Sequence, residues 1–280
     1  MAIATLLAKH PEFSKKYEMV NVQPVHLISL EDIPALEEQM RSIQLFIYQP
    51  VSDSYRGLPG LSTTSLLENI NQSAKTISFP VAYFTGYHPE VTYLKSTPNT
   101  VINEPFPYHD LNILKLYAQG KSVEEAVTII RSEDFYDTEF VHHNFHKTLG
   151  RLYEREKNLD VQLSSFIKEN FHLLKLFHTF NHPTQWTINF MIESILSILV
   201  FPASWKTYRE LVNTDVLSRS SFPIYPSLAK KMGLEFDLAN EYRIDKISYA
   251  PKNVIERFFD FYKKNSDCVA SYLKYTSMRT

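Results

Sequence analysis

Short apolar runs alternate with amphipathic segments over about the first 105 residues of the chain. The runs at 17–28, 43–50 and 75–84 are rich in β-branched or aromatic residues and contain or end in proline, which is typical of strands. Residues 30–40 and 62–74 predict helices, the second opened by Ser/Thr capping candidates. Strands that alternate with helices predict a small parallel sheet in this part of the chain. The chain itself begins with helical composition, in "MAIATLLAKHPEF".

From about residue 109 onward the pattern is helical nearly throughout. Ser122 and Glu125 have the spacing of a capping box, and Pro183 fits the first position of another helix. The predicted helices of this half span residues 122–132, 137–157 and 160–177, the segment after Pro183, and residues near 227–232, 251–264 and 267–275. The pattern therefore predicts an α/β fold with a small parallel sheet in the N-terminal part and a large, mostly helical C-terminal half. We expect residues 1–280 to form a single domain, with an α/β part at 1–105 and a helical part at 106–280.

The composition is that of an ordinary globular protein, with 44% hydrophobic and 21% charged residues and a net charge of −2. No basic excess indicates a nucleic-acid partner. Cys268 is the single cysteine, so an intrachain disulfide is excluded, and we expect this thiol to be inert packing. The longest apolar run, at 190–201, contains Glu193 and is too short to span a membrane. Since no signal peptide is evident at the first residues, the sequence predicts a cytoplasmic protein.

Polar and aromatic side chains follow two of the predicted strands, and ligands of open parallel sheets gather beyond the carboxyl ends of strands. Arg56, in "IYQPVSDSYRG", can make a forked contact with a phosphate or carboxylate, and Gln49 and Tyr55 can orient a ligand by hydrogen bonds. The alternative is structural: Asp53 caps a turn and Arg56 pairs locally. The candidate binding residues are Gln49, Asp53, Tyr55 and Arg56 after the first of these strands, and Tyr83, Tyr87 and His88 after the second.

His182, in "LFHTFNHPTQW", is the candidate catalytic residue. It is expected at the N-terminus of the helix that follows Pro183, where free N–H groups and partial positive charge collect. An imidazole there can act as a general base, or an anion can bind. A capping residue with a core histidine is the structural alternative.

His142 and His146 would share one face of a helix at the i, i+4 spacing of metal ligands. No HExxH pattern accompanies them, so the sequence predicts a helix surface and no metal site. GxSxG, GxGxxG and P-loop patterns are also absent from the sequence.

Together, the strings "QLFIYQPVSDSYRG", "ISFPVAYFTGYHPE", "PYHDLNILKLYAQGKSVEEAV" and "LFHTFNHPT" resemble the WcbI family of polysaccharide (capsule) biosynthesis proteins. The resemblance runs in order over about residues 1–200. It implies an α/β protein that binds coenzyme A and acetylates a sugar of a surface polysaccharide. It also implies that the loop residues above line the site and that His182, in its Asn-His-Pro string, serves as the base.

The family typically carries a Gly-Asn-Cys-Gln string just before a helix like the one at the start of this chain. Two expectations follow. Either the natural protein begins further upstream, or this member lacks that strand and thiol and cysteine-dependent chemistry is closed to it.

The leading hypothesis is an acyl-CoA-dependent O-acetyltransferase, with acetyl-CoA as donor and a sugar as acceptor. In this hypothesis His182 deprotonates the acceptor hydroxyl and Arg56 holds a phosphate of CoA. Two alternatives stay open: a carbohydrate esterase or deacetylase in the same cleft, and a non-catalytic CoA- or glycan-binding module. From the resemblance alone, other polysaccharide-biosynthesis enzymes, such as a glycosyltransferase, are expected as partners.

Overall fold

The structure is a computed structural model that describes residues 2–97, 100–201, 215–267 and 269–270. Its chain divides into two compact units. Unit 1 comprises Met1–Ala82, Arg151–Phe166 and Gln185–Asp215, and unit 2 comprises Tyr83–Gly150, Ile167–Thr184 and Val216–Thr280. Both units are therefore built from separate stretches of the sequence. The single domain expected from the sequence stays a prediction.

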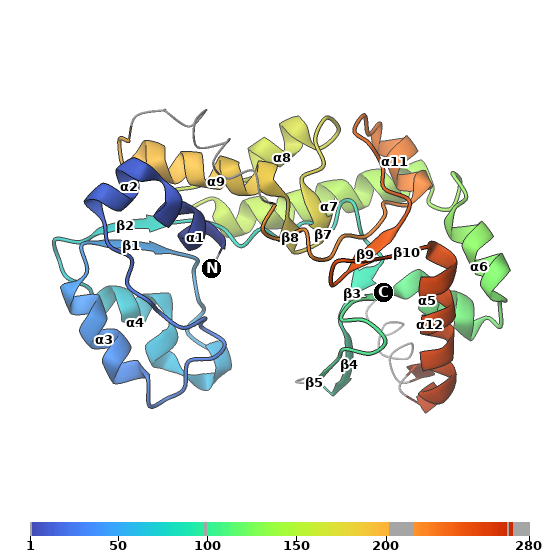
Figure 1. Ribbon diagram of the computed structural model, residues 1–280, viewed down its shortest axis with the longest axis horizontal. Helices are drawn as coiled ribbons and strands as arrows, with labels where there is room; N and C mark the ends of the chain where they lie inside the picture. The colour runs from blue at the N-terminus through green and yellow to red at the C-terminus, as the bar shows by residue number, and fades with distance from the viewer. Residues whose placement is uncertain (1, 98–99, 202–214, 268, 271–280) are drawn as a thin grey trace. The chain divides into compact units, whose positions relative to one another are not determined.

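Unit 1 contains the predicted parallel pair of strands. β1 (Leu45–Tyr48) runs beside β2 (Lys75–Ser78), with Leu45 opposite Lys75 and Tyr48 opposite Ser78 (Figure 1). Between the two strands lies α4 (Thr63–Glu68), whose N-cap Ser62 accepts a hydrogen bond from the N–H of Ser65. The expected connection of strand, helix and parallel strand is confirmed, with a shorter helix than the pattern predicts. The other helices of unit 1 are α1 (Ala2–Lys9), α2 (Pro11–Lys16), α3 (Ile33–Ser42), the short 3-10 turns η1 (Tyr55–Gly57) and η2 (Pro59–Leu61), and α9 (Gln185–Ile198).

The strand expected at 17–28 does not form. This segment runs from coil into a turn, and Met19, Val20, Val22 and Leu27 are between 42% and 59% exposed. An apolar run becomes a strand only where another strand pairs with it, and none does so here among the described residues.

Two helices take the chain between the units. α7 (Thr138–Glu156) confirms the helix predicted at 137–157, and the boundary of the two units falls within it, after Gly150. α8 (Ser164–Asn170) is much shorter than the predicted segment at 160–177: residues 171–176 form a turn, a bend and coil, and Phe177 begins strand β7 (Phe177–Thr179). Periodicity alone does not separate a short buried strand from a buried helical segment.

Unit 2 combines helices with short antiparallel pairs, so the α/β class is confirmed. Ser122 and Glu125 form the predicted capping box at the start of α6. The short strands of unit 2, which the pattern did not predict, pair either within a hairpin or with a distant part of the chain. The strand pairs are β3 (Val91–Thr92) with β6 (His109–Asp110), β4 (Leu94–Thr97) with β5 (Thr100–Ile102), β7 with β8 (His182–Pro183), and β9 (Tyr242–Ile244) with β10 (Ile247–Tyr249).

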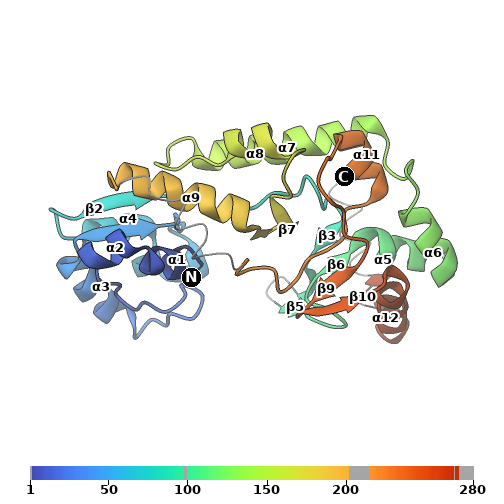
Figure 2. The ribbon, with the colours of Figure 1, turned by 45° about the horizontal axis from the view of Figure 1, so that its top comes forward.

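Three helices of unit 2, α5 (Leu111–Ala118), α6 (Val123–Ile130) and α12 (Pro251–Lys264), pack on one another. α12 lies against both α5 and α6, as Figure 2 shows. Its buried face includes Val254, Ile255 and Phe258. α11 (Pro226–Met232) confirms a further predicted helix. The helix expected at 267–275 and Cys268 lie largely or wholly outside the described residues.

Candidate functional site

His182 lies in strand β8, on a hairpin that crosses back from β7. Thr179 is paired with His182, and Phe180 and Asn181 form the turn between them. Pro183 belongs to the strand, and helix α9 begins only at Gln185. The expectation that Pro183 starts the helix, with His182 at its positive end, is therefore wrong. Pro183 is placed in the hairpin because Phe177 pairs with it, which the local sequence does not reveal.

A network of hydrogen bonds surrounds His182. The hydroxyl of Tyr108 is 3.2 Å from His182 Nε2 and 3.1 Å from Asn181 Oδ1. Asn181 Oδ1 also accepts a hydrogen bond from Thr179 Oγ1 at 3.1 Å, and Asn181 Nδ2 donates to the hydroxyl of Tyr93 at 2.9 Å. These contacts join residues that are far apart in sequence and fix the face that His182 presents.

The protonation of His182 follows from its surroundings. Burial is the main influence on the pKa of His182 and lowers it. The backbone of Ser220 raises this pKa and so offsets part of the effect. The imidazole is therefore neutral at pH 7. The Tyr108 hydroxyl donates its single proton to Asn181 Oδ1, so the lone pair of His182 Nε2 is unoccupied in the tautomer that carries the proton on Nδ1. A neutral imidazole with an unoccupied lone pair is the form that general-base catalysis needs.

Aromatic rings hold this network in place. Phe180, in the β7–β8 turn, is buried and makes edge contacts with Tyr83, Tyr93 and Tyr108 at ring separations of 5.1–5.7 Å. Tyr83 is 38% exposed, so this candidate binding residue presents part of its ring to solvent. Two residues that were selected from the sequence, Tyr83 and His182, thus belong to one cluster in the structure. Phe180, which also belongs to this cluster, was not selected from the sequence.

Tyr87 and His88 lie inside unit 2. The Tyr87 hydroxyl donates to backbone carbonyls, at 2.5 Å to Phe171 and 3.1 Å to Leu174, and its side chain is fully buried. Gly86 precedes it because a Cβ there would lie 2.1 Å from the ring of Phe84. In this structure both candidates support the fold, and their contact with a ligand stays a prediction.

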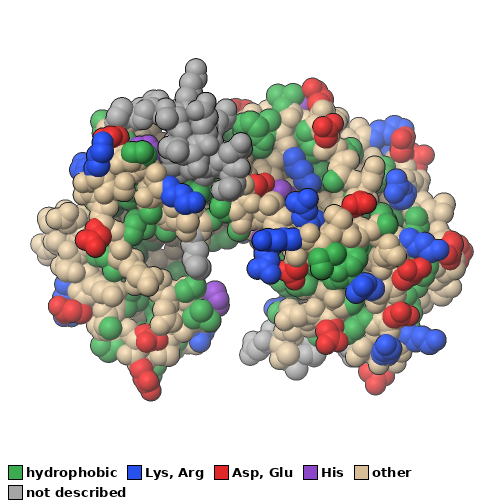
Figure 3. All heavy atoms as spheres, viewed as in Figure 1, with side chains coloured by type: hydrophobic (Ala, Val, Ile, Leu, Met, Phe, Trp, Pro, Cys, Tyr) green, Lys and Arg blue, Asp and Glu red, His purple; other side chains and the backbone are tan. Residues whose placement is uncertain are grey.

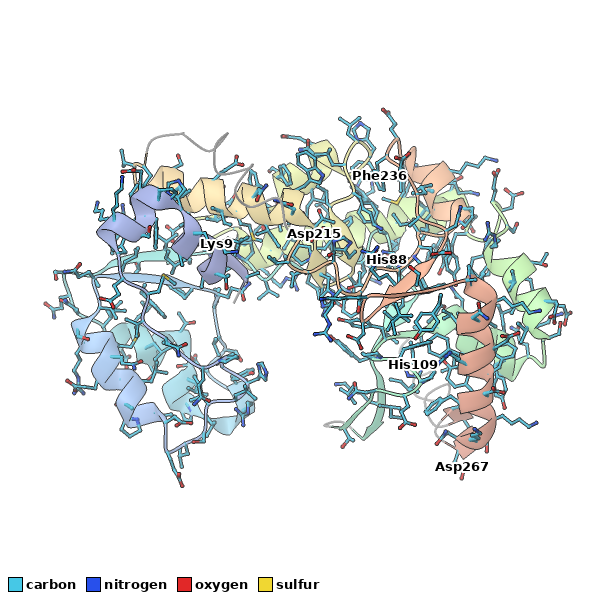
Figure 4. The ribbon with its side chains drawn as sticks, viewed as in Figure 1. Lys9, His88, His109, Asp215, Phe236 and Asp267 are labelled. Atoms are coloured by element: carbon cyan, nitrogen blue, oxygen red, sulfur yellow. The ribbon has the colours of Figure 1, made fainter. Side chains whose placement is uncertain are left out.

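His88 belongs to a buried group of titratable side chains (Figure 4). His88 Nδ1 is 3.6 Å from Glu90 Oε1, and burial lowers the pKa of His88 to about 3 and raises that of Glu90 to about 8. Asp110 accepts hydrogen bonds from Tyr225 and from two backbone N–H groups at the start of α5, yet burial and Glu90 raise its pKa to about 7. The sequence analysis missed Glu90 and Asp110. Asp110 carried a signal, since it directly precedes an apolar helix as an N-cap.

The other candidates gather in unit 1, beyond the carboxyl ends of β1 and β2. Gln49 donates to the carbonyl of Pro80 at 3.1 Å and so joins the chain after one strand to the chain after the other. Tyr55 packs on the small core of Ile28, Ile33, Leu36 and Leu61. Arg56 donates to the carbonyl of Ile28 at 2.8 Å from a left-handed backbone with φ +53°. Asp53 is exposed in the turn before them.

Local contacts therefore use part of the hydrogen-bonding capacity of the loop that follows β1. Ile28 takes one N–H group of Arg56, and the guanidinium has five, so donors remain for an anion. At the end of β2, Asp160 accepts hydrogen bonds from the N–H and the hydroxyl of Ser78, both at 2.7 Å. Asp160 was not identified from the sequence, because it lies far from Ser78 in the chain.

The eight candidates divide between the units, with Gln49, Asp53, Tyr55 and Arg56 in unit 1 and Tyr83, Tyr87, His88 and His182 in unit 2.

His142 and His146 lie exposed on α7. Among the described residues, no group of three or more His, Cys, Asp or Glu side chains is placed to hold a metal ion. Within the same residues, no helix combines the length and the apolar character needed to cross a membrane.

Comparison with known proteins places the chain in a family. The model of a family described as polysaccharide biosynthesis enzyme WcbI matches residues 1–204. A solved structure has the same fold, with a TM-score of 0.77 and 24% identity over 98% of this chain and 94% of the other. That structure is described as native WcbI, a novel polysaccharide biosynthesis enzyme, without a disulfide bond between coenzyme A and a cysteine of that protein. No curated protein matches. Since the family model covers well over half of the 280 residues, the chain belongs to the WcbI family of polysaccharide biosynthesis enzymes.

Proposed function

We propose that this protein transfers an acetyl group from acetyl-CoA to a hydroxyl group of a sugar during polysaccharide biosynthesis. The observation that carries the proposal is the half-buried imidazole of His182, with Nε2 held 3.2 Å from the Tyr108 hydroxyl. The role in polysaccharide biosynthesis comes from the family, and the choice of CoA is supported by the ligand named for the solved relative.

The reaction needs one base and a thioester. The acceptor hydroxyl gives its proton to His182 Nε2, and its oxygen attacks the acetyl carbonyl of acetyl-CoA. The carbon–sulfur bond then breaks, and the CoA thiolate takes up the proton from His182 to leave as the free thiol. The products are an O-acetyl sugar and CoA. A neutral imidazole is required for the first step, and the burial that lowers the pKa of His182 favours that form.

Each unit has its own proposed binding residues. In unit 1, Arg56 uses the N–H groups that Ile28 leaves open to hold a phosphate of CoA, and Gln49 and Tyr55 orient that ligand. In unit 2, the exposed ring of Tyr83 receives the apolar face of the sugar. The proposed binding residues are Gln49, Asp53, Tyr55, Arg56, Tyr83, Tyr87 and His88, with Tyr87 and His88 supporting the site from within.

The experiment measures thiol release from acetyl-CoA in the presence of sugar acceptors, for the wild type and for His182→Ala. General-base catalysis contributes about 10²–10⁴-fold, so we expect turnover to fall by that factor while CoA still binds in a calorimetric titration. His143→Ala is the matched control, because that imidazole is exposed on α7, away from the network. Turnover in His182→Ala equal to the control would remove His182 from the mechanism.

A second assay separates transfer from hydrolysis. Acetate released from an acetylated sugar without CoA would identify an esterase or deacetylase, and the transfer proposal would then be wrong. Saturable CoA binding without turnover on any acceptor would indicate a binding module.

A further inference from the structure

Residues 219–222 leave a turn and pass between two strands of unit 2, where Ser221 forms an isolated antiparallel bridge with Arg243. The N–H of Ser221 donates to the carbonyl of Arg243 at 2.8 Å, and the N–H of Arg243 donates back to Ser221 at 2.7 Å. On the other edge, the N–H of Phe222 donates to the carbonyl of His178 at 3.0 Å. The segment is therefore held between β7 and β9 by backbone hydrogen bonds.

Alternation of side chains gives this segment a buried and an exposed face. Ser220 and Phe222 are buried, whereas Arg219 is exposed and Ser221 is half-buried. On the neighbouring strand Tyr242 and Ile244 are buried and Arg243 is exposed. Since Ser221 and Arg243 are directly opposite each other, their side chains lie on the same outer face, and Arg219 is exposed in the turn just before it.

Basic residues lie next to one another around this outer face. Lys175 Nζ donates to Ser221 Oγ at 3.1 Å, so a third cation lies beside the Arg243 position. The N–H of Lys246, at the β9–β10 turn, donates to the carbonyl of Arg219 at 2.9 Å. Arg219 meets one carboxylate, that of Asp245 at 3.1 Å, and both side chains of this pair are more than 60% exposed, so the pair is weak. We call Lys175, Arg219, Ser221, Arg243 and Lys246 the basic strip.

The backbone at the turn is strained. Asp245 and Lys246 have φ values of +50° and +72°, the left-handed region that two-residue hairpin turns require and that Asn-Gly usually supplies. A lysine is held where glycine is preferred, and such strain is found preferentially at functional sites. Figure 3 shows Lys and Arg side chains gathered near the β9–β10 pair of Figure 1, although the chain as a whole has a net charge of −2.

We propose that the basic strip binds a phosphate group of a substrate. An arginine fork matches two phosphate oxygens, while lysine adds a point charge and Ser221 a hydroxyl donor. The segment also lies next to the hairpin that carries the candidate base, because the N–H of Phe222 donates to the carbonyl of His178 in β7, which pairs with β8. The phosphate belongs either to CoA or to a phosphorylated sugar acceptor. The naming of CoA and a sugar acceptor as the two possible ligands rests on the proposed function, whereas the inference that the strip binds a phosphate does not.

The test is a calorimetric titration with adenosine 3′,5′-bisphosphate, which carries the phosphates of CoA, and with glucose 1-phosphate. We expect at least one of them to bind the wild type, and its affinity to fall about tenfold or more in Arg243→Gln, since a charged hydrogen bond is lost. Arg131→Gln is the matched control, because Arg131 is an exposed arginine of the same unit outside the strip. Arg219→Gln is a second variant, and circular dichroism checks that each variant is folded.

The outcomes identify the ligand or overturn the inference. Loss of the bisphosphate in Arg243→Gln assigns the strip to CoA, and loss of the sugar phosphate assigns it to the acceptor. Absence of binding by the folded wild type, or equal affinities in Arg243→Gln and Arg131→Gln, would refute the site. Acetyl transfer that is unaffected by Arg243→Gln would refute it too and leave the proposed function intact. Binding that depends on Arg243 in a protein without transferase activity would support the phosphate site and refute the proposed function.

Discussion

Tyr108→Phe isolates the contribution of one hydroxyl to the network around His182. The substitution keeps the ring, whose edge contacts with Phe180 and Phe222 at 5.4 and 6.0 Å do not involve the oxygen. It removes the group that lies 3.2 Å from His182 Nε2 and 3.1 Å from Asn181 Oδ1. Asn181 Oδ1 loses one of its two donors and keeps the hydrogen bond from Thr179, while His182 Nε2 loses the oxygen beside it.

The magnitude follows from the burial of that hydroxyl. Tyr108 is 6% exposed, so the partner left behind is not fully hydrated. Loss of one neutral hydrogen bond that leaves a shielded acceptor costs about 1–2 kcal/mol of unfolding free energy. For a chain of this size this corresponds to a decrease in Tm of about 2–4 °C per kcal/mol.

The effect on the reaction has a definite sign. Because the Tyr108 hydroxyl donates to Asn181, its oxygen can accept a hydrogen bond from the protonated imidazole, so its removal lowers the pKa of His182 and moves the acidic limb of the rate profile to lower pH. We also expect kcat to fall about tenfold, because the ring loses a contact that fixes its orientation.

The assay is thiol release from acetyl-CoA measured across pH, together with thermal unfolding. Tyr117→Phe is the matched control, because Tyr117 is half-buried in the same unit among aromatic rings. If Tyr108→Phe matched Tyr117→Phe in Tm and in pH profile, the Tyr108–His182 contact would have no role in either property.

Two further predictions concern stability. Glu156 is fully buried and accepts hydrogen bonds from the N–H groups of Leu163 and Ser164 at 2.9 and 2.7 Å. Glu156→Ala should therefore lower the free energy of unfolding, measured in urea, by about 3–5 kcal/mol. The control Glu154→Ala removes an exposed carboxylate and should cost less than about 1 kcal/mol, so equal losses in the two variants would contradict the prediction. Burial raises the pKa of Glu90 to about 8, so the folded protein binds more protons than the unfolded chain, and stability declines as pH rises from the ordinary carboxyl range through about 8. Glu90→Gln should flatten this decline and gain stability relative to the wild type at pH 8, and parallel pH–stability curves for the two proteins would exclude the mechanism.

The fold could be predicted from sequence where short-range rules decide. Ser122 and Glu125 cap a helix because their spacing alone brings side chain and backbone together. The parallel pairing of β1 with β2 followed from two apolar runs with a helix between them. The helix predicted at 137–157 formed because its length and period leave no competing strand.

The predictions failed where partners distant in the chain decide. Residues 17–28 have the composition of a strand and remain unpaired, whereas Phe177, predicted as the last residue of a helix, begins a buried strand that pairs with His182–Pro183. In both places the local sequence was compatible with two conformations, and hydrogen bonds made elsewhere selected one.

The same division applies to the candidate site. The sequence by itself determined the residue types, the family through its ordered motifs, and the helices whose caps and periods are local. Only the tertiary structure decided that His182 faces Tyr108, 74 positions away in the chain, that Tyr87 and His88 are buried, and that Lys175 reaches Ser221 beside Arg243. The physical reason is that hydrogen bonding and burial depend on distances in space, and a single sequence specifies these only through the packing of the whole unit.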